Sequence, residues 1–228
     1  LHTAYRRQRQ MCIRDRSHCK VLAMDMDSTL INIECIDEIA GVAGVKDKVS
    51  EITEAAMRGE IKDFSESLRR RVALLKDVPA EALEQVYTEK LRLNPGAERL
   101  ITTAQAAGIK VLLVSGGFTF FTDRLRERLK LDSAHANTLE IDNGVLTGRV
   151  LGDILDADAK AVYLREFART HGATKEQIIA MGDGANDLKM LGAAGFPVAY
   201  HAKPLVRQQT RYALNVSGLD GVLNWFES

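Results

Sequence analysis

Two aspartates, Asp25 and Asp27, end an apolar run in the stretch MDMDSTLI. Side chains two residues apart on an extended backbone point to the same side. Carboxylates placed in this way can bind a cation, or can serve as nucleophile and general acid. The sequence also permits a plainer role, in which Asp27 or Ser28 caps a helix. A calcium loop fits poorly, because Leu30 and Ile36 stand where that loop requires its glycine and its final glutamate.

Two other apolar runs also end in polar residues. The first ends in SGG at 115–117 before a helical pattern, where backbone N–H groups and a helix N-terminus would favour an anion. The second ends in GDGAND, which misses the dinucleotide-binding pattern because Asp187 replaces its last glycine. Since Asp187 would repel a pyrophosphate, Asp183 and Asp187 are better candidates for holding a cation. Asn186 could cap the helix that follows or reach the same site.

A cation beside an anion-binding turn is what phosphoryl transfer requires. A phosphate dianion repels a carboxylate nucleophile, so a divalent metal has to offset the charges of both. Phosphate monoesters hydrolyse extremely slowly without a catalyst, which demands strongly preorganised electrostatics. On spacing alone, Lys160 in DADAKAV would be an ordinary surface lysine.

The elements that must position these residues follow from the apolar pattern. Apolar runs closed by Gly or Asp, typical of strands buried on both faces, occur at 20–25, 110–117, 177–184 and 196–200. Helical patterns between them indicate an open α/β sheet with right-handed crossovers. Ligands in such sheets bind at the carboxyl ends of the strands, where the polar residues lie. A hairpin is predicted at about 134–152, around Asp142-Asn143-Gly144.

The long gap after the first strand, residues 35–93, has no strand signal and is expected to form several amphipathic helices. Inserted there, these helices would cover the strand ends like a lid. On one of them, Arg71 lies inside an apolar stripe, because Phe64, Leu68, Arg71 and Leu75 fall within about 60° of one another on one helix face. An arginine in such a stripe needs a partner, either another lid residue or a ligand.

The composition narrows the class of protein. The 228 residues are 46% hydrophobic and 27% charged, which is ordinary for a globular chain. A formal net charge of zero gives no electrostatic reason to expect nucleic-acid or membrane partners. The three cysteines lack disulfide-framework or zinc spacing, which favours a reducing, cytoplasmic location. Residues 1–19 are expected to be a disordered or non-native basic tail, and a nucleic-acid-binding arm is the less favoured alternative.

In order along the chain, DMDSTL, SGG, Lys160 and GDGAND resemble the four motifs of the haloacid dehalogenase-like phosphohydrolases. Other strings, ECIDEIA, AMRGE, SLRRRV, SGGFTFF, ANTLEI and AYHAKP, closely resemble the phosphoserine phosphatases of that superfamily. The resemblance implies a Rossmann-like three-layer α/β core with a mainly parallel sheet at 20–34 and 94–228, and a small helical-bundle cap at 35–93. It also implies an Mg²⁺-dependent enzyme that hydrolyses O-phospho-L-serine to L-serine and phosphate, the last step of L-serine biosynthesis.

The resemblance assigns roles to four aspartates. It implies that Asp25 is the nucleophile and forms an aspartyl-phosphate. Asp27 would protonate the departing serine oxygen and then activate the hydrolytic water. Mg²⁺ would be held by the Asp25 carboxylate, the Asp27 backbone carbonyl and Asp183, with Asp187 supporting the metal without binding it.

The resemblance also implies which residues bind the substrate. Ser115 and the Gly116 N–H would bind phosphoryl oxygens, Lys160 would neutralise the charge of Asp25 and the phosphoryl group, and Asn186 would help to order the site. At the root of the lid, Glu34 would hold the ammonium group of phosphoserine, and in the lid Arg71 would hold its carboxylate. Met57 and Phe64 would line the apolar side of the pocket, or could equally be lid core.

Two other functions remain open from the sequence. The enzyme could pass the phosphoryl group to another small alcohol, such as homoserine, instead of water. A non-enzymatic sensor of phosphate esters is disfavoured because all the motif residues are intact. Either way we expect a small-molecule substrate, no nucleic-acid or membrane partner, and a monomer or a homodimer.

Overall fold

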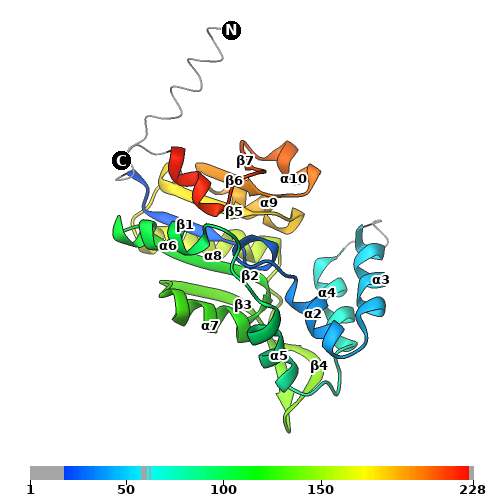
Figure 1. Ribbon diagram of the computed structural model, residues 1–228. Helices are drawn as coiled ribbons and strands as arrows, with labels where there is room; N and C mark the ends of the chain where they lie inside the picture. Colours follow the sequence, from blue (N-terminus) through cyan, green and yellow to red (C-terminus); the bar gives the residue numbers. More distant parts are fainter. Residues whose placement is uncertain (1–17, 58–60, 62, 226–228) are drawn as a thin grey trace.

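The computed structural model describes residues 18–57, 61 and 63–225. In this part of the chain, seven strands form one sheet in the order β4-β3-β2-β1-β5-β6-β7 (Figure 1). The strands are β1 (Val21–Met24), β2 (Lys110–Phe118), β3 (Ser133–Asp142), β4 (Val145–Leu151), β5 (Ile178–Gly182), β6 (Phe196–Tyr200) and β7 (Tyr212–Leu214). Only β3 and β4 are antiparallel to each other. The predicted α/β class with a mainly parallel sheet is therefore confirmed.

Helices cover both faces of this sheet and complete three layers. One face carries α6 (Ala97–Ala106), α7 (Thr119–Leu129) and the short η6 (Leu219–Trp225), and the other carries α8 (Ala157–Thr170), α9 (Leu188–Gly192) and α10 (Pro204–Gln209). Successive strand side chains point to opposite faces, so Leu22 and Met24 pack on one side of β1 and Val21 and Ala23 on the other. Burial on both faces explains why the strands read as continuous apolar runs.

The segment between β1 and β2 forms the helices that its apolar stripes predicted. These are α2 (Cys35–Val42), α3 (Lys46–Met57), α4 (Phe64–Ala73), α5 (Glu81–Gln85) and the short η3 (Val86–Lys90). Each contributes at least one fully buried side chain to the core, such as Ile39, Val49 and Leu83. Figure 1 shows α2, α3 and α4 grouped beyond the ends of the strands, to one side of the sheet.

The predicted hairpin is confirmed, with more structure than the sequence indicated. β3 and β4 are joined by Asn143 and Gly144, whose φ angles of 49° and 79° suit a tight hairpin turn. The first part of β3 also pairs in parallel with β2, from Leu112 opposite Ser133. The loop before α5 pairs with β4, because the Leu146 N–H donates to Val78 O over 2.8 Å. The hairpin thus connects the sheet to the helical insertion.

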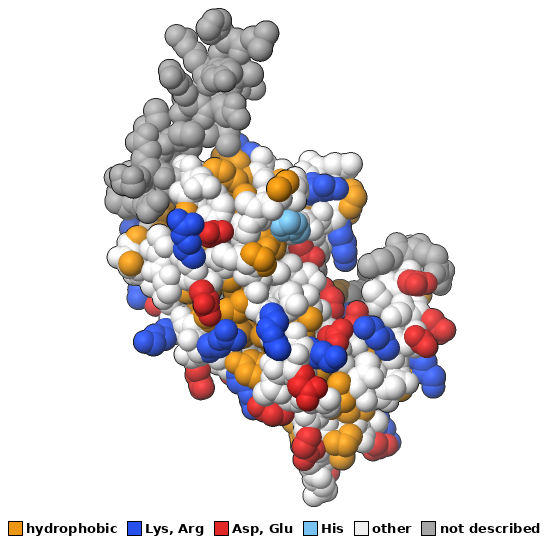
Figure 2. Space-filling model, viewed as in Figure 1, with side chains coloured by type: hydrophobic (Ala, Val, Ile, Leu, Met, Phe, Trp, Pro, Cys, Tyr) orange, Lys and Arg blue, Asp and Glu red, His pale blue; other side chains and the backbone are white. Residues whose placement is uncertain are grey.

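The predicted N-terminal tail lies largely outside the described residues. Cys19 is described, is only 5% exposed and packs in the core, so the core begins at least one residue before the predicted boundary. None of the helices in the described ranges has the length and apolar character of a membrane span. Figure 2 shows acidic and basic side chains interspersed over one face of the molecule, consistent with a net charge of zero.

Candidate active site

The sheet register brings Asp25, Ser115 and Asp183 together at the carboxyl ends of β1, β2 and β5. Met24, the last residue of β1, lies opposite Leu113 of β2 and Met181 of β5. The residues that follow these positions therefore emerge together, because the three strands are parallel. The chain moves outward from β1 in both directions, so this edge is the point where the strand order reverses and where α/β sheets bind ligands.

Lys160 joins two of the aspartates at this edge. Its Nζ lies 2.7 Å from Asp25 Oδ1 and 2.7 Å from Asp187 Oδ1. Lys160 is fully buried on α8, so the surface position suggested by its spacing alone is wrong. Burial disfavours its charge, but the two carboxylates outweigh that effect and raise the pKa of the ammonium group. A buried lysine between carboxylates is thus held in its charged form.

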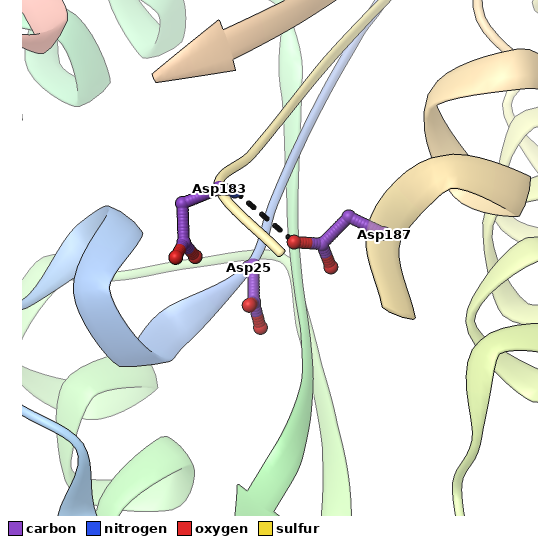
Figure 3. Close-up of side chains that lie close together, drawn as sticks. All are labelled: Asp25, Asp183 and Asp187. Carbon is purple, nitrogen blue, oxygen red and sulfur yellow. Dashed lines mark hydrogen bonds between the residues drawn. The ribbon is translucent and has the colours of Figure 1, made fainter. Parts of the chain in front are cut away.

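The carboxylates of Asp25, Asp183 and Asp187 converge from three elements (Figure 3). One oxygen from each lies within 4.8 Å of the others. Burial, followed by the charge of Asp187, raises the pKa of Asp25 well above its usual range and the pKa of Asp183 to about 7. Lys160 opposes the rise at Asp25. Such crowding of buried negative charge favours a bound cation.

Asp187 is committed to protein partners. Its Oδ1 accepts from Lys160, and its Oδ2 accepts the N–H groups of Asp183 and Gly184 over 3.1 and 3.0 Å. Both oxygens therefore have partners, which fits a role in shaping the turn. Asp25 and Asp183 are the members of this cluster with oxygen atoms better placed for a hard cation such as Mg²⁺. Thr29 orients Asp183 by donating to its Oδ1 over 3.2 Å.

Asp27 follows Asp25 in the irregular turn η2 (Met26–Leu30) and lies between the sheet and the insertion. Its Oδ1 accepts the N–H of Cys35, the first residue of α2, over 3.0 Å. Its Oδ2 accepts a long hydrogen bond of 3.4 Å from Ser115 Oγ. Burial raises the pKa of Asp27, and the Cys35 N–H opposes that rise. The capping role and the chemical role considered for this aspartate are therefore compatible.

The SGG sequence forms the end of β2. Ser115 is fully buried, and its Oγ accepts the Gly117 N–H over 2.9 Å. A Cβ on Gly117 would lie 2.5 Å from Asp27 Oδ2, so only glycine lets the two segments approach this closely. A Cβ on Gly116 would lie 3.0 Å from Phe64 Cζ, which places the first residue of α4 directly over this turn.

Glu34 lies at the root of the helical insertion, immediately before α2, and Arg71 lies on α4 within it. Glu34 is exposed, yet the neighbouring protein displaces enough water to raise its pKa to about 7, with Asp27 adding to the rise. Its Oε1 accepts from Ser28 Oγ over 2.7 Å. Arg71 is half-buried, and desolvation lowers its pKa while the charges of Asp37, Glu34 and Asp27 oppose the change. The Arg71 guanidinium group therefore interacts electrostatically with the carboxylates of Glu34 and Asp27.

The helix-face prediction for α4 is confirmed. Leu68 is buried one turn before the half-buried Arg71, whereas Arg69 and Arg70 are exposed; Leu75 is buried as well but lies in the turn that follows the helix. Arg70 instead pairs with Glu66 on the outer face. The side chain of Met57 lies outside the described part of the chain. Asn186 is half-buried in the GDGAND turn, against Gly184, where a Cβ would meet its Oδ1.

Sequence reasoning missed two residues that adjoin the site. Asn137, 2% exposed on β3, donates to Gly116 O over 2.8 Å and accepts the Leu155 N–H over 2.8 Å. It therefore fixes the SGG turn relative to the segment that leads to α8. The charge of Lys203 opposes the rise in pKa that burial causes at Glu34 and Asp183. Asn137 lies in the string ANTLEI and Lys203 in AYHAKP, but neither spacing nor periodicity distinguishes these two residues from their neighbours.

Known proteins are similar to this chain in sequence and in fold. The family model for haloacid dehalogenase-like hydrolases matches residues 22–192. A phosphoserine phosphatase from a Polaromonas species is 58% identical over 211 residues, which is 91% of this chain and 89% of the relative. A solved phospho-aspartyl intermediate analogue of a phosphoserine phosphatase is 40% identical, with a TM-score of 0.85, over 92% of this chain and 99% of that chain. A substrate-bound phosphoserine phosphatase is 39% identical, with the same TM-score and coverage.

Proposed function

The chain belongs to the haloacid dehalogenase-like hydrolases, and we propose that it hydrolyses O-phospho-L-serine to L-serine and phosphate. The observation that carries the proposal is the meeting of Asp25, Lys160 and Asp183 at one sheet edge, together with Arg71 of the insertion, whose charge interacts with those of Glu34 and Asp27. The first group suits a phosphoryl centre, and the second suits the carboxylate of an amino acid. The reaction would complete L-serine biosynthesis in the cytoplasm, by a monomer or a homodimer.

In the first step, an Asp25 carboxylate oxygen attacks phosphorus. The bond between phosphorus and the serine oxygen breaks, and Asp27 gives its proton to that oxygen. The raised pKa of Asp27 supports this role, because a buried carboxyl can keep a proton to donate. In the second step Asp27 takes a proton from water, whose oxygen attacks the phosphoryl group and releases phosphate and Asp25.

The remaining residues at the edge handle the charge of the phosphoryl group. Lys160 offsets the negative charge on Asp25 from 2.7 Å away. Ser115 and the Gly116 N–H are proposed to bind phosphoryl oxygens, and Asn137 keeps the Gly116 peptide in place. Asn186 is proposed to help order the turn that carries Asp183.

Mg²⁺ is proposed to bind to the Asp25 carboxylate, the Asp27 backbone carbonyl and Asp183. The donors are all oxygen atoms, and the pKa values of Asp25 and Asp183 are raised first by burial and then by the charge of Asp187, a cost to the ionised carboxylates that a cation would offset. When bound, the ion would neutralise part of the charge shared by nucleophile and phosphoryl group. Asp187 would hold the Asp183 turn through its two backbone hydrogen bonds.

The affinity for Mg²⁺ is expected to increase with pH. Metal binding requires ionised carboxylates, and the pKa of Asp183 without metal is about 7. Because this pKa is raised, protons compete with the ion below that pH and cease to compete above it. Calorimetric titration with Mg²⁺ at about pH 6 and about pH 8 should give a clearly lower Kd at the higher pH. Equal Kd values at both would contradict this assignment, and Asp183→Asn should weaken binding at both.

Substrate choice is proposed to depend on the insertion, with residues 35–93 acting as a cap over the site. Glu34 would bind the ammonium group of phosphoserine and Arg71 its carboxylate. Phe64 is proposed to line the apolar wall, because its ring lies against Gly116. Met57 is proposed to line the same wall.

Arg71→Ala is expected to lower kcat/KM for phosphoserine roughly 10–100-fold, mainly through KM, because a hydrogen-bonded ion pair with the substrate carboxylate is lost. Phosphoethanolamine has the ammonium group but no carboxylate, so the same variant should process it as the wild type does. Arg70→Ala is the matched control, since Arg70 faces outward and pairs with Glu66. An equal loss with both substrates would rule out carboxylate recognition by Arg71.

The function itself is tested by following serine and phosphate release with Mg²⁺ and with a chelator. A panel of phosphoserine, phosphothreonine and small sugar phosphates tests the substrate. Added homoserine tests whether the phosphoryl group can pass to another alcohol. We expect stoichiometric serine and phosphate from phosphoserine with Mg²⁺ alone; no release above the chelated control would refute the proposal.

A further inference from the structure

Asn94 lies where the chain re-enters the core after the insertion, directly before Pro95 and α6. The Ala97 N–H donates to Asn94 O over 3.1 Å, and the Leu219 N–H donates to Pro95 O over 2.8 Å. A residue before proline is also restricted to extended conformations. The backbone around Asn94 is therefore fixed to the core by hydrogen bonds.

The side chain of Asn94 reaches across to the turn that carries Asp27. Its Nδ2 lies 2.8 Å from Thr29 O, 3.0 Å from Ile31 O and 3.4 Å from Ser28 O. An amide has two N–H donors, so the two shorter contacts are the main hydrogen bonds. All three neighbours are acceptors, and an oxygen in place of this nitrogen would face only acceptors. The Asn94 N–H adds a fourth contact, to Leu30 O over 2.9 Å.

The braced turn is one that needs support. Ser28 has a φ of 56°, a left-handed conformation that residues other than glycine seldom adopt. The same turn presents three polar side chains to the site: Asp27, Thr29 to Asp183 Oδ1, and Ser28 to Glu34 Oε1. A shift of its backbone would move all of them together.

We propose that Asn94 is a positioning residue for the reaction. It touches no reacting atom, but it holds the Ser28–Ile31 backbone where Asp27 can serve first the leaving oxygen and then the water. The effect of Asn94 on the reaction rate rests on the proposed function. Its effect on the position of the Ser28–Ile31 backbone is independent of that function. Small displacements of a catalytic group are costly, so loss of the brace should lower kcat more than it raises KM.

Two variants and one control test this role. Asn94→Ala removes the side chain, and Asn94→Asp keeps its size but removes both N–H donors. Asn32→Ala is the control, because Asn32 lies beside the short pairing of Ile31 with Leu93 and its Oδ1 accepts the exposed Arg92 N–H over 2.9 Å, away from the turn. Both Asn94 variants should lose roughly 10–100-fold in kcat for phosphoserine, with KM within about threefold, while the control stays near wild type.

Hydrogen exchange gives a second readout that needs no substrate. The N–H groups of Ser28, Leu30 and Ile31 donate to backbone carbonyls between Asp25 and Ile33, in and around the turn, and should exchange faster in Asn94→Ala than in Asn32→Ala. Unchanged exchange, kcat within about threefold in both Asn94 variants, an equal loss in the control, or failure of both Asn94 variants to fold would each overturn the inference. If the wild type released no phosphate from phosphoserine, the proposed function would fail and the exchange data would still decide the role of Asn94.

Discussion

Replacing Asp25 by asparagine is expected to lower kcat for phosphoserine by about 10⁴-fold or more. The amide is a poor nucleophile and carries no charge, so it can neither attack phosphorus nor help to hold Mg²⁺. The fold should survive, because asparagine fills the same space and its oxygen can still accept the Met26 N–H that Asp25 accepts over 2.7 Å. Steady-state phosphate release and a thermal melt of the same preparation separate the two effects.

A surface aspartate provides the control for this substitution. Asp158 pairs with Lys189, and the side chains are 72% and 56% exposed, so Asp158→Asn should leave kcat within about twofold. Turnover by Asp25→Asn within about tenfold of wild type would exclude Asp25 as the nucleophile. If Asp25→Asn were largely unfolded at the assay temperature, the loss of activity would reflect a structural role of Asp25 instead.

Lys160→Met is expected to affect both stability and activity. Lys160 is fully buried between Asp25 and Asp187, and removing one partner of a buried ion pair leaves an uncompensated charge. The expected cost is about 3–5 kcal/mol in the free energy of unfolding, measured by urea denaturation with a chelator present. Activity should be lost as well, since among the described residues Lys160 alone places a positive charge within ion-pair distance of Asp25.

The cost of Lys160→Met should depend on pH. The pKa of Asp25 is raised by burial and lowered by Lys160, so it rises further in the variant. A carboxyl whose pKa is higher in the folded than in the unfolded state stabilises the fold at pH values below its unfolded-state pKa. That stabilisation is lost as the pH rises through the folded-state pKa. The destabilisation should therefore be larger at about pH 8 than at about pH 5. A cost that does not change with pH would contradict the pairing.

Two further variants make the Lys160 result specific. Lys189→Met breaks the exposed pair with Asp158 and should cost less than about 1 kcal/mol. Asp187→Asn removes one of the buried charges, so the double variant with Lys160→Met should cost less than the sum of the single variants. Additive costs would mean that Lys160 and Asp187 do not interact.

The strand ends could be predicted from the sequence because two simple rules fix them. Apolar runs buried on both faces identify parallel strands, and parallel strands bring their carboxyl ends to one edge. Asp25, Ser115 and Asp183 follow from these rules without any further information. The place of Arg71 on the inner face of α4 follows equally well from helical periodicity.

Residues whose positions depend on tertiary contacts could not be predicted in this way. Lys160 looks like any exposed lysine until α8 packs against the sheet and buries it beside Asp25. Asn137 and Asn94 act through backbone carbonyls that are distant in sequence, and no local pattern encodes such pairs. The parallel pairing of β3 with β2 was hidden for the same reason, because the turn at Asn143 indicated only the hairpin.

The most direct test of the whole account is to locate the phosphoryl group on the enzyme during turnover. Wild-type protein is mixed with Mg²⁺ and phosphoserine labelled in the phosphoryl group, quenched in acid within the first turnover, digested and analysed by mass spectrometry. We expect label on the Asp25 carboxyl and none in Asp25→Asn. Label on another residue, or equal labelling of Asp25→Asn, would contradict this expectation.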